Sequence, residues 1–586
     1  MTGTDTTRRD VARLDGGPAV EPEVRTLGEA LVRAAASPGP DGGLVLVGRD
    51  GTERSRTYRR LLEDASRLLG GMRAAGASPG ETVILQAADD LELLTAFWAC
   101  VLGGLVPMPV GAGATADQRA EAPRLLRRVW EGYGRPKVVT GTGQPIAPEV
   151  AADPGWASAW LGDASSLLSH RADPHHSTGP QHSTDPDHPT DPHHHPTDPH
   201  HHRADPDDTA VLLLTSGSTG VPKAVVLSHR NVLSRTAATV RTNRLDATTR
   251  SFNWMPLDHV GGLIMFHARD TYLGCHQVHG RLEWVLEDPL RWLTLMDRHR
   301  VDTTWAPNFA FGLINDQADR LRGLSLDLGR LRYVMNGGEA IRGGAVRRFL
   351  ELLAPFGLAG DVMYPGWGMS ETSAGVADCE FGSSGTGDDR YVPVGRPQPG
   401  TSVRVVDERD APLPVGVTGH LQVTGASVTA GYYRNTEQNR RSFTADGWFR
   451  SGDLAYVENG LLTVTGRADD VIELGGIACH GHEIEARVED LDFVAPSYTV
   501  ASVVTGRDGR SEELAVFFHQ RGGPGVSEAC RRIRDRVAET IGVEVHHVVP
   551  VLKEDVPKTG IGKLRRAGLR ERFESARAKA VQENPL

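Results

Sequence analysis

The sequence predicts an α/β fold: a large N-terminal domain with mixed sheets flanked by helices, and a smaller α+β domain at the C-terminus. Three observations support this prediction. The chain has 586 residues, too many for one compact core, so at least two domains are expected. Strand-like and helix-like segments alternate after residue 26, which is typical of largely parallel sheets. Residues 467–586 are richer in charge and carry a shorter set of elements.

Apolar residues mark the individual elements. They recur every three or four positions over 27–34 and 57–75, which predicts amphipathic helices, and a further helix is predicted at 91–102. Short apolar runs predict buried strands at 44–47, 83–85, 105–110, 210–214, 224–227 and 331–335. In the C-terminal part we expect strands at 498–504 and 514–518 and a helix at 527–540.

Composition divides the chain into parts. Residues 1–25 are polar and are expected to be disordered, 26–466 form the large domain, and 467–586 form the small one. Within the large domain, residues 170–208 repeat Asp-Pro-His and Thr-Asp-Pro and hold 11 of the 23 histidines without an apolar anchor. Such a segment cannot build a core and is expected to be a disordered insertion. Clustered imidazoles also chelate metals weakly, so a metal-binding role is the alternative.

Bulk properties exclude several classes of protein. The chain is 39% hydrophobic and 24% charged, as in ordinary globular proteins, and its net charge of −11 gives no sign of a nucleic-acid surface. The five cysteines form no C-x-x-C pair and are expected to be free thiols in a reducing compartment. No apolar run reaches transmembrane length, and the N-terminus lacks a signal-peptide core. These features predict a cytoplasmic enzyme.

A glycine-rich loop follows the predicted strand at 210–214. Hydroxylated residues and glycines precede Pro222 and Lys223 in the order Thr215, Ser216, Gly217, Ser218, Thr219 and Gly220. Glycines let successive N–H groups face one anion, hydroxyls add donors, and the lysine adds a mobile charge. This is not a Walker loop, because a strand-like run follows instead of a helix. The residues favour phosphate binding over an exposed turn of similar composition.

More motifs follow in a fixed order. They are Ser251-Phe-Asn-Trp-Met-Pro-Leu-Asp-His-Val-Gly-Gly262, Asn336-Gly-Gly-Glu339, Tyr364-Pro-Gly-Trp-Gly-Met-Ser-Glu-Thr372, Gly447-Trp-Phe-Arg-Ser-Gly-Asp453, Gly466-Arg-Ala-Asp-Asp470 and Pro557-Lys-Thr-Gly-Ile-Gly-Lys563. With the glycine-rich loop, they resemble the signatures of the adenylate-forming superfamily, which includes acyl-CoA synthetases, acyl-AMP ligases, luciferases and nonribosomal adenylation domains. The resemblance covers about residues 27–570 apart from the insertion and is closest to acyl-AMP ligases.

The resemblance implies ATP-dependent activation of a small carboxylic acid. The acid attacks the α-phosphate of Mg·ATP to give acyl-AMP and pyrophosphate, with catalysis by positioning and charge neutralisation. The acyl group then passes to a phosphopantetheine thiol, which is expected to belong to an acyl or peptidyl carrier protein in polyketide, nonribosomal peptide or lipid biosynthesis.

The resemblance also assigns the base and the sugar of the nucleotide. Gly338 and Glu339 are expected beside the adenine, and Trp367 is expected to stack on it where most members have tyrosine. Asp453 would accept hydrogen bonds from both ribose hydroxyls. Arg467 would contact the ribose or a phosphate.

At the phosphates, Lys223 of the glycine-rich loop would supply a mobile positive charge. Glu371 would hold Mg²⁺, a hard cation that prefers carboxylate oxygen, and Thr372 would contact the α-phosphate. Lys563 would reach from the small domain to the acyl carboxylate and offset the charge that develops there.

The segment 251–262 is expected to line the acyl pocket. His259 would lie near the substrate carboxylate, although a satisfied histidine at a helix start is the alternative. Asp258 could pair with the α-ammonium group of an amino acid, and a buried carboxylate needs some partner. Asn308 and Phe309 resemble pocket residues of fatty acyl-AMP ligases; a strand-to-helix turn would also explain Asn308.

The acceptor thiol is predicted from the hinge region. Asp469 matches the pivot about which the mobile small domain rotates. Gly476 matches the glycine beside which the pantetheine arm passes. Many members carry a basic residue two positions later, where this chain has Ala478, and this favours a carrier protein over free CoA.

Other readings of the function stay open. They are an acyl- or aryl-CoA ligase, an amino-acid-activating enzyme, and a catalytically silent homologue that serves as a scaffold. The silent homologue is disfavoured because Lys223, Glu371, Asp453, Arg467 and Lys563 are all present.

Overall fold

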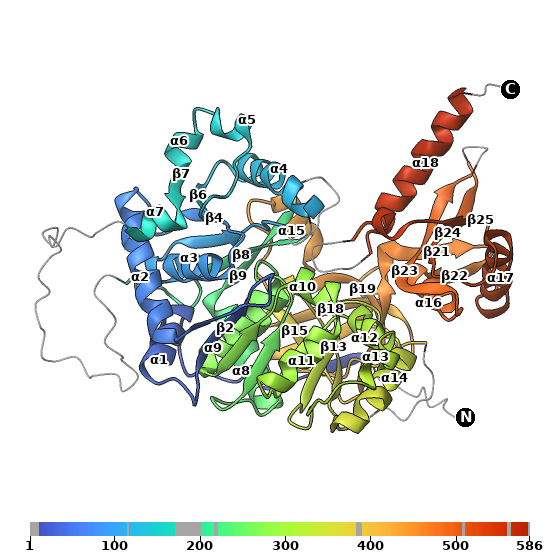
Figure 1. Cartoon of the computed structure of the whole chain (residues 1–586), viewed down its shortest axis with the longest axis horizontal. Coiled ribbons are helices and arrows are strands. Elements are labelled where there is room, and N and C mark those ends of the chain that lie inside the picture. The colour runs from blue at the N-terminus through green and yellow to red at the C-terminus, as the bar shows by residue number, and fades with distance from the viewer. Residues whose placement is uncertain are drawn as a thin grey trace, which may run out of the picture.

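The protein is described by a computed structural model that covers residues 11–113, 116–169, 201–215, 221–382, 390–506, 510–558 and 564–583. It has a large N-terminal lobe and a smaller C-terminal lobe, which is orange to red in Figure 1. The large lobe contains mixed sheets flanked by helices, and the small lobe is α+β. The predicted fold class is therefore confirmed.

The largest sheet has nine strands. Its six central strands run parallel, and antiparallel strands form both edges. In spatial order they are β16 (Arg396–Pro397), β15 (Ala374–Asp378), β14 (Met363–Met369), β13 (Tyr333–Gly337), β12 (Thr303–Ala306), β10 (Arg250–Asn253), β11 (His276–His279), β2 (Gly43–Val47) and β3 (Glu53–Arg56). Strands β12 and β13 are buried along their whole length, as expected for parallel strands covered on both faces.

Helices separate and flank these strands. They are α1 (Leu27–Ala36), α8 (His229–Thr242), the π-helix η1 (Gly261–Ala268), α9 (Arg269–Leu273), α10 (Leu282–Glu287), α11 (Leu290–Arg298), α12 (Asn308–Asn315), α13 (Ala318–Leu321), α14 (Gly343–Leu353) and the short 3₁₀ turns η2 (Ala354–Phe356) and η3 (Ser370–Thr372).

A second, parallel sheet of four strands lies in the blue and cyan part of Figure 1. Its order is β5 (Val106–Pro109), β4 (Thr82–Gln86), β6 (Lys137–Thr140) and β7 (Trp160–Asp163). The antiparallel hairpin of β8 (Thr209–Thr215) and β9 (Lys223–Ser228) packs beside β5. The helices of this region are α2 (Tyr58–Ala74), α3 (Asp90–Gly103), α4 (Ala116–Gly132), α5 (Pro148–Ala151), α6 (Trp156–Ala159) and α7 (Ala164–Ser169).

Side-chain caps explain why the predicted helices start where they do. The hydroxyl of Thr57 accepts a hydrogen bond from the Arg60 backbone N–H at the start of α2. Asp89 accepts from two backbone N–H groups at the start of α3, and that helix ends at Gly104 with φ of +67°. Such caps satisfy donors that a helix cannot satisfy internally.

The third sheet of the large lobe is antiparallel throughout. Its order is β1 (Arg13–Asp15), β17 (Thr401–Val406), β18 (Gly419–Gly425), β19 (Phe449–Glu458) and β20 (Leu461–Arg467), and helix α15 (Thr436–Ser442) precedes β19. The prediction of disorder for residues 1–25 is therefore wrong from residue 11 onward, because β1 pairs with β17. Residues 1–10 lie outside the described residues.

The small lobe begins after β20, at the 3₁₀ turn η4 (Ala468–Asp470). It contains the hairpin of β21 (Val471–Leu474) and β22 (Ile477–His480), the sheet of β23 (Val494–Thr505), β24 (Glu512–Gln520) and β25 (His547–Pro550), the helices α16 (Gly481–Glu489), α17 (Val526–Thr540) and α18 (Arg566–Glu583), and the turn η5 (Lys553–Asp555). Its core is separate from that of the large lobe. Helix α18 projects away from the body in Figure 1.

The end of the histidine-rich segment differs from its prediction. His201 Nε2 lies 3.0 Å from the hydroxyl of Ser66, and the backbone N–H of His202 donates to the Leu102 carbonyl at 2.8 Å. Residues 201–208 therefore pack onto the large lobe and are not part of a disordered insertion. Residues 170–200 lie outside the described residues. Among the described helices, none is long and apolar enough to cross a membrane.

Candidate active site

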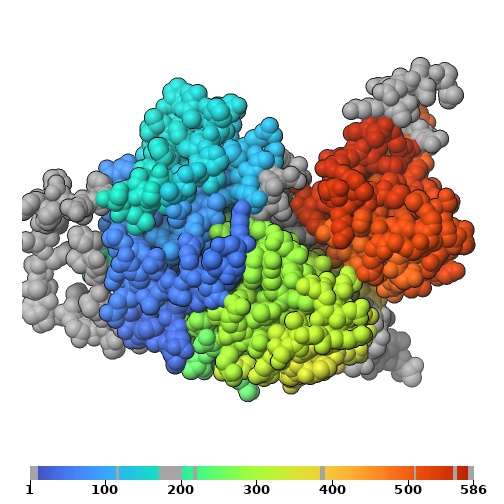
Figure 2. Space-filling model, viewed as in Figure 1, coloured from blue at the N-terminus to red at the C-terminus, as the bar shows by residue number. Residues whose placement is uncertain are grey.

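A cavity of about 1360 Å³ lies between the two lobes and is lined by both. Figure 2 shows the C-terminal lobe as a separate body packed against the green and yellow part of the large lobe. Cavity residues such as Asn308, Gly338 and Ser370 come within two residues of the ends of β12, β13 and β14, so the cavity lies at the carboxyl ends of parallel strands. This is where open α/β sheets bind ligands. The volume exceeds the roughly 300–1,000 Å³ of most small-molecule pockets, which suits two substrates.

Asp453 is held from two sides in this cavity. Arg467, its neighbour across β19 and β20, donates from Nη1 to Asp453 Oδ1 at 3.1 Å. Trp367, on β14, donates from Nε1 to Asp453 Oδ2 at 2.8 Å. Gly452 has φ of +77°, and a Cβ there would lie 2.9 Å from the Arg467 guanidinium, so glycine is required beside the carboxylate. The predicted base and ribose residues are thus brought together.

The predicted magnesium ligand lies nearby. Glu371 is 6% exposed and accepts a hydrogen bond of 2.7 Å from the hydroxyl of Tyr432. Burial raises the pKa of Glu371, and the Tyr432 hydrogen bond opposes that rise. Lys223 Nζ lies 5.4 Å from the centre of the Tyr432 ring, and both residues line the cavity with Thr215. No role was predicted for Tyr432, although the Gly431-Tyr-Tyr-Arg434 motif marks its position.

Thr372 does not reach the cavity, and its predicted contact with the α-phosphate is wrong in this structure. Its hydroxyl is fully buried and lies 2.7 Å from the Ala374 carbonyl oxygen, while the Met369 N–H donates to it at 2.9 Å. The 3₁₀ turn η3 directs Thr372 into the protein and leaves Ser370 and Glu371 in the cavity wall. In the turn η3, Ser370 therefore provides the hydroxyl group that lines the cavity.

The predicted adenine loop forms another wall. Gly338 and Glu339 line the cavity, and Gly338 has φ of +83°. Glu339 Oε1 accepts a hydrogen bond from the Phe309 N–H at 2.6 Å, at the start of α12. Asn308 Oδ1 accepts from Asn336 Nδ2 at 3.3 Å and from the Arg342 N–H at 3.1 Å. Asn308 and Phe309 are thus in the wall as predicted, and Asn308 also braces the loop.

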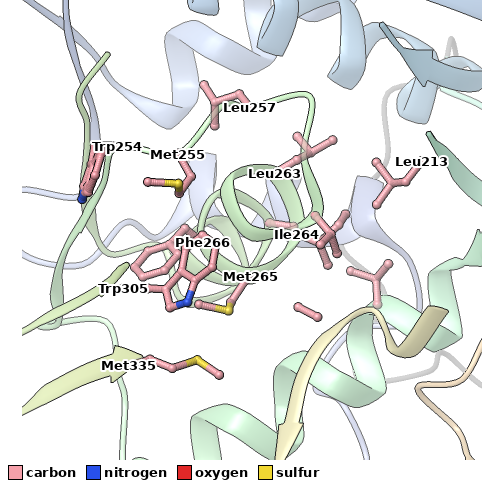
Figure 3. Packing of buried hydrophobic residues seen from close by; sticks show 14 of the residues in the cluster. Leu213, Trp254, Met255, Leu257, Leu263, Ile264, Met265, Phe266, Trp305 and Met335 are labelled. Carbon is pink, nitrogen blue, oxygen red and sulfur yellow. The ribbon is translucent and has the colours of Figure 1, made fainter. Parts of the chain in front are cut away.

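The π-helix η1 shapes the other end of the cavity. His259 precedes it and lines the cavity, and its Nδ1 accepts a hydrogen bond from the Gly261 N–H at 3.2 Å. Figure 3 shows Met265 of η1 pointing toward Trp305, with Met335 of the next strand nearby. A Cβ on Gly261 would lie 2.4 Å from the Trp305 ring, so only glycine fits. Six residues line this end of the cavity, and we call them the apolar pocket: Val260, Gly261, Met265, Trp305, Phe309 and Met335.

Asp258 points the other way. It is absent from the cavity wall, and its Oδ2 would lie 2.6 Å from a Cβ on Gly111. Burial raises its pKa. His259 therefore lines the cavity, whereas the Asp258 carboxylate lies beside Gly111. The prediction of Asp258 as a pocket residue is wrong in this structure.

The small lobe contributes Asp469 and the tip of the β21–β22 hairpin. Asp469 lines the cavity from the turn η4, which joins the lobes. Gly476 has φ of +79° in the hairpin turn, and Ile477 and Ala478 beside it line the cavity while Gly476 itself does not. Lys563 and residues 216–220 lie outside the described residues. Leu564, which follows Lys563, lines the cavity and pairs with Lys558 in a β-bridge.

Ion pairs join the lobes around the cavity. Arg342 binds Glu489, whose side chain is 3% exposed. Arg390 Nε donates to Glu483 Oε2 at 2.6 Å, and the Tyr391 hydroxyl donates to Glu483 Oε1 at 2.8 Å. Burial alone would raise the pKa of Glu483, but hydrogen bonds from His480, Arg390 and Tyr391 lower it overall. The Glu483 carboxyl group is therefore ionised at neutral pH.

The match to known families agrees with this geometry. Residues 33–433 match the family described as AMP-binding enzyme. The chain belongs to the AMP-binding enzyme family. The predicted superfamily is confirmed, and so is its reaction class, an ATP-dependent, AMP-forming ligase that activates an acid.

Relatives include nonribosomal peptide synthetases. The nonribosomal peptide synthetase apvA of Aspergillus terreus (strain NIH 2624 / FGSC A1156) is 30% identical over 568 residues, which are 93% of this chain and 58% of the relative. The chain therefore spans little more than half the length of this AMP-binding relative.

Solved structures of AMP-binding enzymes show the same fold. The structure of McyG A-PCP complexed with phenylalanyl-adenylate is 33% identical, with a TM-score of 0.83 over 97% of this chain and 98% of that one. The adenylation domain of a keto acid-selecting NRPS module bound to keto acyl adenylate is 32% identical, with a TM-score of 0.70 over 97% of this chain and 100% of that one.

Proposed function

We propose that this AMP-binding enzyme converts a carboxylic acid without an α-ammonium group, such as a 2-oxo or aryl acid, into its acyl adenylate. The observation that carries this proposal is the apolar pocket. Its side chains are apolar or aromatic, and Asp258, the predicted partner of an ammonium group, points out of the cavity. A cationic group buried there without a carboxylate would be costly.

The reaction follows from the arrangement of the cavity. One carboxylate oxygen of the acid attacks the α-phosphorus of ATP, the bond to the β-phosphate oxygen breaks, and pyrophosphate leaves. Asp453 and Arg467 hold the ribose, and Lys223 with Ser370 contacts the phosphates. His259 orients the acid: because Nδ1 accepts from Gly261, the ring proton of the neutral histidine is on Nε2, which can donate to a substrate oxygen.

Magnesium fits the residues present. Glu371 is a buried carboxylate at the phosphate end, and a divalent cation would offset the cost of its burial. Bound magnesium would neutralise charge on the phosphates. Lys563 is proposed to contact the acid, and Asp469 to be the pivot of the small lobe.

The acceptor is proposed to be the phosphopantetheine thiol of a carrier protein. The hairpin tip at the cavity carries Ala478, not a cation that would bind the nucleotide phosphates of CoA. The McyG structure is an A-PCP unit, and this supports a carrier protein. Free CoA is the second candidate.

Amino-acid activation is a second candidate for the acid, because the McyG structure holds phenylalanyl-adenylate. ATP–pyrophosphate exchange with phenylpyruvate and phenylalanine separates the two, since these acids differ only at the α-carbon. Benzoate and a fatty acid extend the panel. Exchange with phenylpyruvate or benzoate but not with phenylalanine supports the proposal. Preferential exchange with phenylalanine overturns the substrate class.

A further inference from the structure

One hydrogen bond joins the two sheets that surround the nucleotide end of the cavity. Trp367 belongs to β14 of the nine-stranded sheet, and Asp453 belongs to β19 of the antiparallel sheet. The indole N–H of Trp367 donates to Asp453 Oδ2 at 2.8 Å. Trp367 is 7% exposed and Asp453 is 8% exposed, so little water competes for this bond.

The bond completes the orientation of the carboxylate. Arg467 Nη1 donates to the other oxygen, Oδ1, at 3.1 Å, and it also donates to the Ser451 carbonyl at 3.0 Å. Because each carboxylate oxygen accepts a hydrogen bond, from Arg467 on Oδ1 and from Trp367 on Oδ2, the carboxylate plane is held relative to both sheets. Hydrogen bonds to an ionised acceptor are about twice as strong as neutral ones, so losing either donor should let the carboxylate turn.

We propose that Trp367 is a positioning residue that couples recognition of the sugar to the wall that binds the base. It acts through Asp453: the indole N–H sets the carboxylate in the orientation that accepts the ribose hydroxyls. The inference rests on the proposed function, because it requires ATP in this cavity. Its consequence is that discrimination between ATP and 2′-deoxy-ATP depends on the N–H of residue 367.

The test is calorimetric binding of ATP and 2′-deoxy-ATP to the full chain with magnesium. Trp367→Phe keeps an aromatic face but lacks the donor. We expect it to lower the preference for ATP over 2′-deoxy-ATP about tenfold, as Asp453→Asn should, with a smaller loss of 2′-deoxy-ATP affinity. Trp448→Phe is the matched control: Trp448 is also buried and stands beside β19, but it packs under Arg404 outside the cavity. It should leave the preference unchanged.

A second variant tests the same role if Trp367→Phe does not fold. Benzothienylalanine at position 367 has the shape of tryptophan with sulfur in place of the N–H, and it should lower the preference equally. An unchanged preference in either folded variant, together with its loss in Asp453→Asn, overturns the role of Trp367 alone. A wild-type chain that binds neither nucleotide overturns the proposed nucleotide site and this inference with it.

Discussion

The hydroxyl of Tyr432 donates a 2.7 Å hydrogen bond to Glu371 Oε1, and the same ring lies 5.4 Å from Lys223 Nζ. Tyr432 thus stands between the predicted magnesium ligand and the lysine of the glycine-rich loop. A buried carboxylate that is meant to bind a cation must stay ionised, and this hydrogen bond opposes the effect of burial on its pKa.

Tyr432→Phe should weaken magnesium binding. Without the hydroxyl the pKa of Glu371 rises further, so protonation competes with the cation and the defect grows as the pH falls. We expect about a tenfold higher magnesium requirement for pyrophosphate exchange at pH 6.5 and a smaller effect at pH 8.5. Tyr433→Phe is the control, because that ring stacks on Tyr133 outside the cavity. Equal magnesium requirements in the two variants would contradict a role for Tyr432 in magnesium binding.

The sequence predicts the elements that have strong local patterns. It is less accurate where long-range pairing creates a strand or where one turn decides which side chain faces the cavity. The helix at 57–75 and the strand at 210–214 match α2 and β8, because periodicity and caps act locally. Strand β1 has only three residues and exists because β17 pairs with it from far along the chain. Ser370 and Thr372 stand in one 3₁₀ turn, and the motif alone does not tell which hydroxyl faces the cavity.

The apolar pocket was predicted only in part. Val260, Gly261 and Phe309 belong to segments that the sequence placed there, whereas Met265 and Met335 come from two other elements and were not expected. Asp258 and His259 are neighbours, and the orientation of the turn alone decides which one enters the cavity.

Gly261→Ala should narrow the apolar pocket. Its Cβ would lie 2.4 Å from the Trp305 ring, so the ring or η1 must shift into the cavity. We expect at least a tenfold rise in the KM of the acid with little change in ATP affinity. Gly312→Ala is the matched control, because Gly312 also lines the cavity but has no atom within 4 Å of the added Cβ. A loss of ATP binding in Gly261→Ala would instead indicate a general folding defect.

The Arg342–Glu489 ion pair should hold the two lobes in the observed orientation. The Glu489 side chain is 3% exposed, so Arg342→Glu places like charges together where little water can screen them and should release the small lobe. We expect a larger radius of gyration in X-ray scattering and faster tryptic cleavage after Arg467. The charge swap Arg342→Glu with Glu489→Arg should restore both. Arg322→Glu, at an exposed pair with Asp319, is the charge-matched control. Failure of the swap to restore compactness would contradict the assignment.

His267 should make the large lobe sensitive to acid. Its Nε2 accepts a hydrogen bond from Trp98 Nε1 at 2.8 Å, and its Nδ1 lies 2.8 Å from Gln277 Oε1, so the ring is neutral. Burial lowers the pKa of His267 to about 4. Because an unfolded histidine has a pKa of about 6.5, the stabilisation is complete above that pH and falls by about 1.4 kcal/mol per unit toward pH 4.

His267→Gln tests this acid sensitivity directly. Glutamine can accept from Trp98 and donate to Gln277, yet it takes up no proton on unfolding. The slope of unfolding free energy against pH, measured in urea between pH 7 and pH 4.5, should fall by about one proton relative to wild type. His279, whose ring centre lies 5.7 Å from that of His267, also has a pKa lowered by burial and leaves a residual slope. His420→Gln, at a partly exposed position in β18, is the matched control for the substitution itself. If His267→Gln kept the full slope, the acid sensitivity would arise elsewhere than at the buried histidine between Trp98 and Gln277.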